Sequence, residues 1–367
     1  MAQWNRVPLI DYIELIGGGT PKTTVPEYWN GNIPWLSVKD FNNDKRYVYS
    51  TEKHISQSGF ENSPTKMLHK DDIIISARGT VGEIAMIPFD MAFNQSCYGI
   101  RASRGIDQPF LYYLLKNCIS QLKRMTHGSV FDTITRDTFA NIEADIPDAE
   151  TQKRISSILA DIDNKIEVND AINDNLQQQA QAIYSSLFID NPDPTWSHGH
   201  LSDLITVKYG KDHKKLADGI YPVYGSGGIM RYVERPLYNK ESVLIPRKGT
   251  LNNVIYVNQP FWSVDTMFYT EMKLPNVAKF VYHFVKAKDL AAMNAGSAVP
   301  SMTTDILNAM EVVIPSASAL EEFESLVAPM YEAMKANDVQ SQALSKMRDA
   351  LLPKLMSGEI DVSAVRL

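Results

Sequence analysis

Residues 148–189 have the sequence DAETQKRISSILADIDNKIEVNDAINDNLQQQAQAIYSSLFI. One column of residues in this stretch recurs every seven positions, at Ile155, Ile162, Asn169, Leu176 and Ile183. Further apolar residues flank that column, at Ile158, Leu159, Ile166, Ile172, Ala180 and Leu187. This spacing predicts a long amphipathic helix with a coiled-coil seam.

The same helix pattern occurs again 168 residues later, where the column holds Phe323, Met330, Asn337, Leu344 and Leu351. Because 168 is 24 × 7, even the polar break repeats, with Asn337 in the place of Asn169. We expect the two helices to pack antiparallel, with Asn169 and Asn337 facing each other and fixing the register. The alternative is that each Asn is a tolerated polar residue on a partly hydrated face.

The duplication includes a globular domain before each helix. Equivalent residues lie 168 apart just before the helices, at Gly128-Ser129 and Gly296-Ser297, Asp137 and Asp305, Glu143 and Glu311, and Ile146-Pro147 and Ile314-Pro315. Further upstream the offset is 170 between Arg78-Gly79-Thr80 and Lys248-Gly249-Thr250, and 192 between Trp4 and Trp196. Along the chain the offset therefore falls from 192 to 168. This fall predicts that the second domain lost residues near its start, where the first carries Gly19 to Asn30.

We therefore predict an α+β fold in which two tandem mixed α/β domains are joined by two long antiparallel coiled-coil helices, with pseudo-twofold symmetry. The expected boundaries are 1–147 for the first domain, 148–190 for the central helix, 191–315 for the second domain and 316–367 for the C-terminal helix and tail. Strand-like runs flank both Arg78-Gly79-Thr80 and Lys248-Gly249-Thr250, and they predict one β-hairpin in each domain.

Composition excludes several classes of protein. No apolar run approaches the length of a membrane span and no signal peptide is evident, so we expect a cytoplasmic protein without a membrane role. The two cysteines, Cys97 and Cys118, lie in no CxxC or Cys/His cluster, and we expect them to be buried rather than to form a disulfide or a metal site. The net charge is −7, but acidic residues gather on the helices and basic residues on the domains.

The sequence lacks the motifs of a self-contained enzyme. It has no GxSxG, HExxH or Walker motif, and its Gly17-Gly18-Gly19-Thr20 cluster lacks the spacing of a phosphate-binding loop. His198 and His200 have no third ligand close by, so a surface pair is the better interpretation. We predict a binding protein without catalytic residues, metal or cofactor of its own.

The chain resembles the DNA specificity (S) subunits of type I restriction-modification systems over essentially its whole length. The segment from Gly18-Gly19-Thr20-Pro21 to Ile33-Pro34-Trp35-Leu36-Ser37 is similar to the opening signature of that family. Similar recurrent forms in the second domain are Tyr221-Pro222-Val223-Tyr224-Gly225, Ile245-Pro246-Arg247-Lys248-Gly249-Thr250 and Phe261-Trp262-Ser263-Val264-Asp265-Thr266. The Ile146-Pro147 and Ile314-Pro315 junctions are also typical of the family.

The resemblance implies two target-recognition domains, each recognising one half of a bipartite site on double-stranded DNA. It also implies that the helices set the gap between the halves and that two methylation subunits dock on them, with restriction subunits joining through those. S-adenosylmethionine, ATP and Mg²⁺ then belong to the partner subunits, and this chain is non-catalytic.

Base recognition favours Arg and Lys for guanine and Asn and Gln for adenine. The candidate DNA-binding residues are Lys39, Arg46, Arg78, Thr80 and Ser129 in the first domain, and Lys211, Lys215, Tyr224, Arg231, Arg247 and Lys248 in the second. For the two Arg/Lys-Gly-Thr turns the alternative is a purely structural hairpin. The runner-up function is a non-enzymatic scaffold whose two modules on a coiled coil bind proteins, which the net acidity would suit.

Overall fold

The computed structural model describes residues 4–126, 133–293 and 301–365. Its contacts divide the chain into two compact units: unit 1 is Met1–Ala171 with Asn337–Leu367, and unit 2 is Ile172–Ala336. Both divisions fall inside a long helix, so each unit holds one globular domain and half of each helix. The linear boundaries expected from the sequence separate helices from domains, whereas the contacts group each half-helix with a domain.

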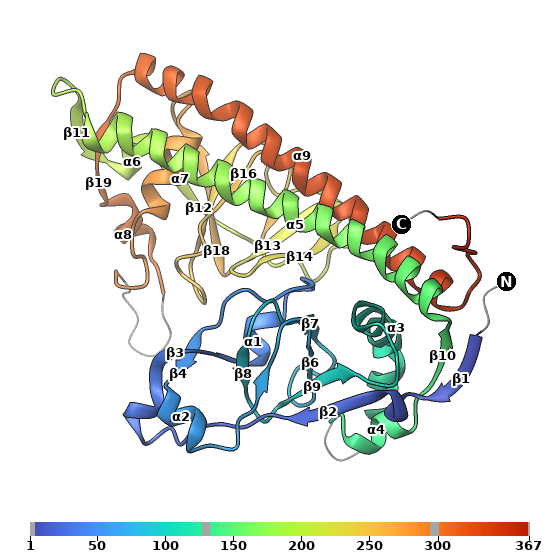
Figure 1. The fold of residues 1–367 in the computed structure, drawn as a ribbon. Coiled ribbons are helices and arrows are strands. Elements are labelled where there is room, and N and C mark those ends of the chain that lie inside the picture. The colour runs from blue at the N-terminus through green and yellow to red at the C-terminus, as the bar shows by residue number, and fades with distance from the viewer. Residues whose placement is uncertain (1–3, 127–132, 294–300, 366–367) are drawn as a thin grey trace. The chain divides into compact units, whose positions relative to one another are not determined.

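The globular domain of unit 1 is built from three small sheets (Figure 1). Their strand orders are β1-β10, β2-β9-β6-β7 and β4-β3-β8-β5, and every pairing is antiparallel except β3 with β8. The elements in chain order are β1 (Trp4–Pro8), η1 (Leu9–Tyr12), β2 (Ile13–Gly17), η2 (Pro26–Tyr28), β3 (Trp29–Leu36), α1 (Val38–Phe41), β4 (Lys53–Ile55), α2 (Gln57–Glu61), β5 (Met67–Leu68), β6 (Ile73–Ser76), β7 (Ile84–Met86), β8 (Met91–Phe93), β9 (Cys97–Ala102), α3 (Gln108–Thr126), α4 (Arg136–Ala140) and β10 (Glu143–Pro147).

Unit 2 repeats this plan with fewer elements. Its sheets have the orders β11-β19, β12-β18-β15-β16 and β14-β13-β17, and β13 pairs with β17 in parallel, as β3 does with β8. The elements are β11 (Ser197–His200), α6 (Leu201–Leu204), β12 (Ile205–Tyr209), β13 (Asp218–Gly225), β14 (Gly228–Val233), β15 (Ser242–Pro246), β16 (Ile255–Val257), β17 (Trp262–Ser263), β18 (Met267–Met272), α7 (Ala278–Lys286), α8 (Thr304–Asn308) and β19 (Glu311–Ile314).

The matching strand orders confirm two tandem, related α/β domains. Both predicted hairpins are also confirmed, since β6 pairs with β7 and β15 pairs with β16 in antiparallel fashion. The prediction was wrong about where the second domain is shorter. Residues 37–52, which include α1, connect β3 to β4 in unit 1, whereas residues 226–227 make the equivalent connection in unit 2. A tight glycine-rich turn can join two antiparallel strands directly, so the longer connection is an addition of unit 1.

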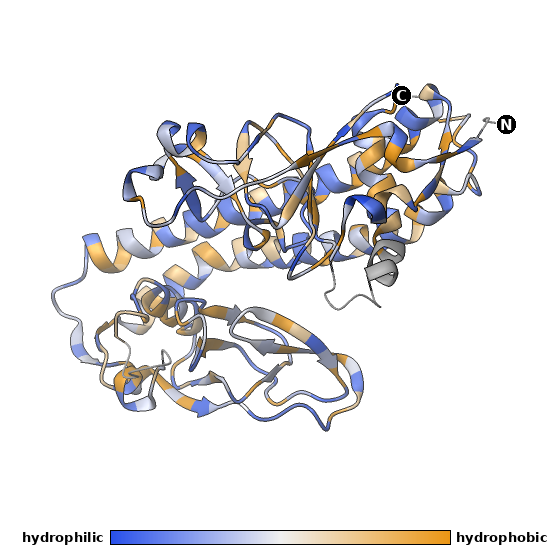
Figure 2. Cartoon of the chain, turned by 90° about the horizontal axis from the view of Figure 1, so that it is seen from below, coloured by the Kyte–Doolittle hydropathy of each residue, from blue (hydrophilic) through white to orange (hydrophobic). Residues whose placement is uncertain are grey.

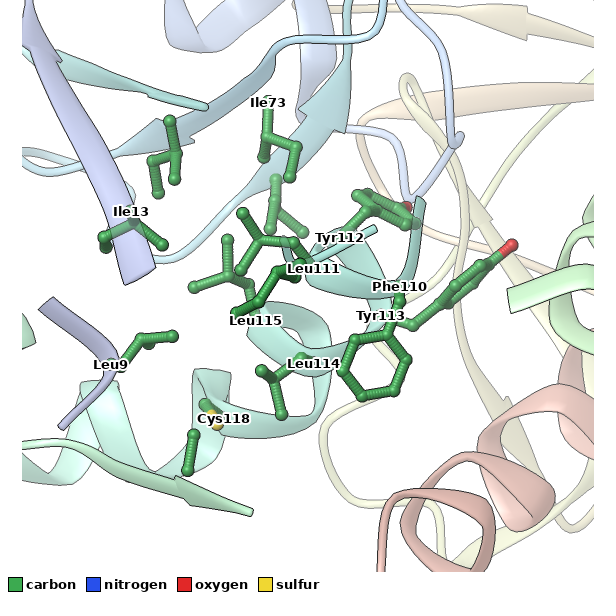
Figure 3. Packing of buried hydrophobic residues seen from close by; sticks show 14 of the residues in the cluster. Leu9, Ile13, Ile73, Phe110, Leu111, Tyr112, Tyr113, Leu114, Leu115 and Cys118 are labelled. Carbon is green, nitrogen blue, oxygen red and sulfur yellow. The ribbon is translucent and has the colours of Figure 1, made fainter. Parts of the chain in front are cut away.

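Helix α3 supplies the centre of the larger core in unit 1. Phe110, Leu111 and Leu115 are fully buried, and Figure 3 shows them packed with side chains from the adjoining strands. Cys97 and Cys118 are both free and buried, as expected. In unit 2, α7 takes the same place and ends at Lys286.

The two long helices are α5 (Ala149–Ser185), which continues as a π-helical turn (Ser186–Asp190), and α9 (Ala317–Met356). Figure 2 shows hydrophobic and hydrophilic residues alternating along both of them. Their halves pack antiparallel within each unit. In unit 1, Asp163 of α5 contacts Arg348 of α9, and Asn169 contacts Ser341; in unit 2, Asn173 contacts Met334. Some flanking apolar residues are exposed rather than buried in the seam, namely Ile172, Leu326 and Met347.

Asn169 is the most buried polar residue of the seam, with no exposed surface. Its amide nitrogen donates to Gln340 Oε1 at 2.9 Å and to Ser341 Oγ at 3.1 Å, and it lies 3.4 Å from the backbone oxygen of Asn337. The Asn169 side chain therefore contacts the opposite helix at the position of its sequence equivalent. Directional bonds of this kind fix the register of two helices better than apolar contacts do.

Candidate nucleic-acid interface

The turn after β6 presents Arg78 and Thr80 to solvent in unit 1. The amides of Ala77 and Arg78 both donate to the backbone oxygen of Ser96, at 2.8 and 3.2 Å, and so hold the start of the turn against the neighbouring strand connection. Gly79 has φ +79°, a left-handed conformation that suits glycine. The backbone is thus fixed while the Arg78 and Thr80 side chains remain exposed.

The equivalent turn in unit 2 is held by the same bonds. The amides of Arg247 and Lys248 donate to the backbone oxygen of Thr266 at 2.9 and 3.2 Å, and Gly249 has φ +87°. The Lys248 side chain is exposed. Arg247 is half-buried: its guanidinium lies 5.3 Å from the ring centroid of Tyr209 and donates to the backbone oxygen of Asp265 at 3.3 Å. The turn therefore has a structural role and also places a cation on the surface in both units.

The other candidates of unit 1 differ in their surroundings. Lys39 is exposed, with its ammonium 3.8 Å from the carboxylate of Glu52. The Arg46 side chain is largely buried against α5, where it donates to the Asn164 side chain and its Nε lies 3.4 Å from Glu167 Oε1. Ser129 lies outside the described residues.

Among the candidates of unit 2, Lys211 and Lys215 are exposed in the connection between β12 and β13. Arg231 donates to Asp218 Oδ1 at 2.6 Å and to the backbone oxygen of Leu216 at 3.0 Å. Tyr224 is buried, and Gln259 donates to its hydroxyl at 3.4 Å. The exposed cations common to both units are thus those of the two turns.

Sequence reasoning missed a polar network, centred on the buried Asp163–Arg348 pair, that joins the domain of unit 1 to its helices. Arg348 of α9 donates to Asp163 Oδ1 of α5 at 2.9 Å and to Asp44 Oδ2 at 2.8 Å. Tyr113 of α3 donates to the second oxygen of Asp163 at 2.7 Å. Burial opposes ionisation of Asp44, but Lys116 and Arg348 hold its pKa below the ordinary value. The signal was present in the sequence, because Arg348 falls on the apolar seam face between Leu344 and Leu351.

The corresponding network of unit 2 is neutral. His283 of α7 lies with Nδ1 2.7 Å from Gln181 Oε1 of α5 and Nε2 2.9 Å from the Tyr331 hydroxyl of α9. Its ring stacks on Tyr184 at 5.4 Å between centroids. An aromatic cluster therefore joins this domain to both half-helices.

The neutral form of His283 makes the stability of unit 2 dependent on pH. Burial, and after it the charge of Lys286, lower the pKa of His283 from 6.5 to about 4. Between these values the unfolded chain binds more protons than the folded one, so stability rises with pH through this window and is constant above it. The expected change in the free energy of unfolding across this window is about 3 kcal/mol. Amide hydrogen exchange, corrected for intrinsic rates, should show α7 losing protection at the acid end while α3 does not. Equal losses in α3 and α7 would contradict this assignment.

No helix among the described residues has the length and apolar character needed to cross a membrane. Within the same residues, no group of three or more His, Cys, Asp or Glu side chains is arranged to hold a metal ion.

Comparison with known proteins decides between the candidate functions. Residues 1–178 and 194–322 match the family model of the type I restriction modification DNA specificity domain. The chain belongs to this family. As a member of it, the protein is a type I restriction-modification specificity subunit, the component that recognises DNA.

Several similar proteins cover nearly the whole chain. The type I restriction enzyme MjaIX specificity subunit of Methanocaldococcus jannaschii is 26% identical over 406 residues, which include 98% of this chain and 94% of that protein. The EcoprrI specificity subunit of Escherichia coli is 23% identical and covers 90% of each chain. The crystal structure of a type I S subunit from M. genitalium has a TM-score of 0.57, 17% sequence identity and 96% coverage of both chains, and so shares the fold of this specificity subunit.

Proposed function

We propose that each unit of this specificity subunit recognises one half of a bipartite DNA site. The observation that carries this proposal is the duplicated turn, which exposes Arg78 in unit 1 and Lys248 in unit 2 on the same backbone framework. Cations on fixed turns bind phosphates and base edges without a large ordering cost. We include Lys39, Lys211 and Lys215 among the DNA contacts, and we assign Arg46 and Tyr224 to packing because their side chains are largely buried.

The long helices act as a spacer between the two recognition domains. A helix rises about 1.5 Å per residue, so a continuous helix converts its length into a separation. α5 and α9 each run through both units, and their halves are antiparallel in each. In dimeric DNA-binding proteins the distance between recognition elements fixes the spacing of the half-sites in the same way.

The helices also present a surface for partner proteins. Large apolar side chains are exposed on them, namely Val168, Val339 and Met347 in unit 1 and Ile172 and Leu326 in unit 2. Two methylation subunits would dock there, one for each unit, and restriction subunits would join through them. In this assembly the specificity subunit is non-catalytic, and S-adenosylmethionine, ATP and Mg²⁺ are bound by the partner subunits. Because its target is DNA, we place the assembly in the cytoplasm.

Selection from a pool of randomised DNA duplexes, in the presence of the methylation subunits, tests this function. We expect two short constant sequences separated by a gap of constant length and variable sequence. Enrichment of one uninterrupted sequence, or of none, would contradict the assignment of one half-site to each unit.

Substitution of the turn cations is expected to weaken DNA binding through the phosphates. In Arg78→Ala and Lys248→Ala, affinity should fall for all DNA sequences, and the slope of log affinity against log salt should fall by about one for each phosphate that is no longer neutralised. Lys288→Ala, an exposed lysine just after α7, is the control and should leave the slope unchanged. If both turn variants behave like this control, the turns are structural hairpins only.

A further inference from the structure

We propose that Arg348 and the segment Asp44-Lys45-Arg46, here called the arm, fix the orientation of the unit 1 domain on its helix pair. A fixed orientation narrows the range of gap lengths, in base pairs between the half-sites, that the protein binds well. The arm lies in the connection of residues 37–52, which unit 2 replaces by residues 226–227. The part that concerns the gap rests on the proposed function, whereas the side-chain bonds do not.

Arg348 connects three parts of unit 1 at one point. Its side chain is 3% exposed, and its guanidinium donates to Asp163 on α5 and to Asp44 in the arm, at 2.9 and 2.8 Å. Lys116 of α3 donates to the other oxygen of Asp44 at 2.8 Å, and Tyr113 of α3 donates to Asp163. Both helices, the arm and α3 are therefore held by a continuous set of charge-assisted hydrogen bonds.

The rest of the arm extends this interface along α5. Lys45 Nζ lies 2.8 Å from Asp170 Oδ2, and Arg46 pairs with Glu167. Asp44 adopts φ +57°, a left-handed conformation that residues other than glycine seldom adopt. Three consecutive residues thus each bind one of the long helices, which defines the angle between the domain and the helices.

Unit 2 shows that the fold itself does not require charges at the positions of Asp163 and Arg348. Its equivalents of Tyr113 and Asp163 are His283 and Tyr331, 170 and 168 residues later, and these two make the same α7–α9 contact without a charge. The position equivalent to Arg348 is Ala180, which is fully buried and apolar. Unit 2 therefore joins a domain of the same topology to its half-helices with aromatic and amide groups around His283, and with a separate ion pair between Lys279 of α7 and Glu324 of α9, whose Nζ–Oε1 distance is 2.6 Å.

The buried Asp163–Arg348 pair contributes little net stability compared with apolar packing, because desolvation offsets the attraction between the charges. The exposed pairs of the arm contribute little because water screens them. What these pairs do provide is direction, since each bond tolerates only a narrow range of donor and acceptor positions. Apolar surfaces can slide by a fraction of a side chain, whereas the Arg348 guanidinium cannot do so without breaking one of its hydrogen bonds. An orienting role thus explains why unit 1 has this cluster and the arm, when unit 2 folds without either.

The test uses the full chain with its methylation subunits and a library in which the gap between the selected half-sites varies. The principal variant is Asp44→Ala with Lys45→Ala, because it removes the bonds of two of the three arm residues to the helices and leaves the buried Asp163–Arg348 pair intact. Arg348→Met is the second variant. Glu143→Ala is the control, since it breaks only the exposed Arg6–Glu143 pair, whose Nε–Oε2 distance is 3.9 Å.

We expect the preference for the best gap over gaps one base pair shorter or longer to fall by about tenfold in the arm variant and in Arg348→Met, with unchanged half-site sequences. The control should retain the preference of the natural chain. A uniform loss of affinity at every gap, with the preference intact, would overturn the proposal and leave the cluster as packing. Failure of the natural chain to select paired half-sites would instead contradict the proposed function.

Discussion

Insertion of one heptad into both long helices is expected to lengthen the preferred gap between the half-sites by about three base pairs, because seven residues rise about 10 Å and one base pair about 3.4 Å. The insertions belong after Ala171 and after Ala336, where the helices face each other: Asn169 lies against Asn337 on one side and Asn173 against Met334 on the other. A heptad keeps the seam residues on the same helix face, so the pairing of α5 with α9 is preserved.

Affinity for the new gap should be lower than for the natural one. Three base pairs turn the duplex by roughly 100°, since one turn contains about 10 base pairs, whereas the heptad hardly rotates the helix faces. Either the DNA must twist or the linked domains must rotate to compensate for that difference in angle. Insertion into α5 alone is the control, and it should abolish paired selection because the seam residues no longer meet. A doubly extended chain that selects the natural gap would rule out the spacer role of the helices.

Replacement of Phe323 by alanine is expected to cost about 3–5 kcal/mol of stability in unit 2. Phe323 has no exposed surface, and its ring contacts those of Tyr184, Phe188 and His283, with centroids 6.1, 5.3 and 5.8 Å apart. Truncation would open a cavity between α9, the end of α5 and α7, where large aromatic groups cannot easily close in. Phe323 itself lies on α9 and contacts Tyr184 of α5, so the packing of both half-helices on the domain should weaken as well.

Leu326→Ala provides the matched control on the same helix, because Leu326 is 46% exposed and its truncation should change stability by less than about 0.5 kcal/mol. The repeat supplies a second comparison in unit 1, where Ile155 is the equivalent of Phe323 and is also buried. Ile155→Ala is expected to destabilise unit 1 by about 2–5 kcal/mol. Urea unfolding followed by the helix signal would measure all three. Equal urea concentrations at the unfolding midpoints of Phe323→Ala and Leu326→Ala would refute the claim that the aromatic cluster stabilises unit 2.

Those features of the fold that depend on local periodicity could be predicted from the sequence. The seven-residue spacing located α5 and α9 within a few residues, and the strand-like runs around Gly79 and Gly249 located both hairpins. The repeat indicated two domains of the same topology. The predicted site of the shortening in the second domain was wrong, because a changing offset shows that one domain is shorter but does not show which connection differs.

The environment of individual side chains was harder to predict, because it depends on contacts between distant parts of the chain. Arg46 and Tyr224 have residue types that suit DNA contact, yet one packs against α5 and the other lies in the core of unit 2. Composition also concealed the network in which the exposed Asp44 meets the buried Asp163 and Arg348, since an acidic helix suggests a solvated face. A charged residue on the seam, such as Arg348, is the pattern that would have indicated it.

Mapping of methylated bases in the genome of the host, with and without the gene for this chain, tests the division of recognition between the two units most directly. The account predicts that the modified bases which disappear with the gene lie in two short constant sequences, always separated by the same number of variable base pairs. Disappearance of modification from a single uninterrupted sequence, or no change at all, would contradict it.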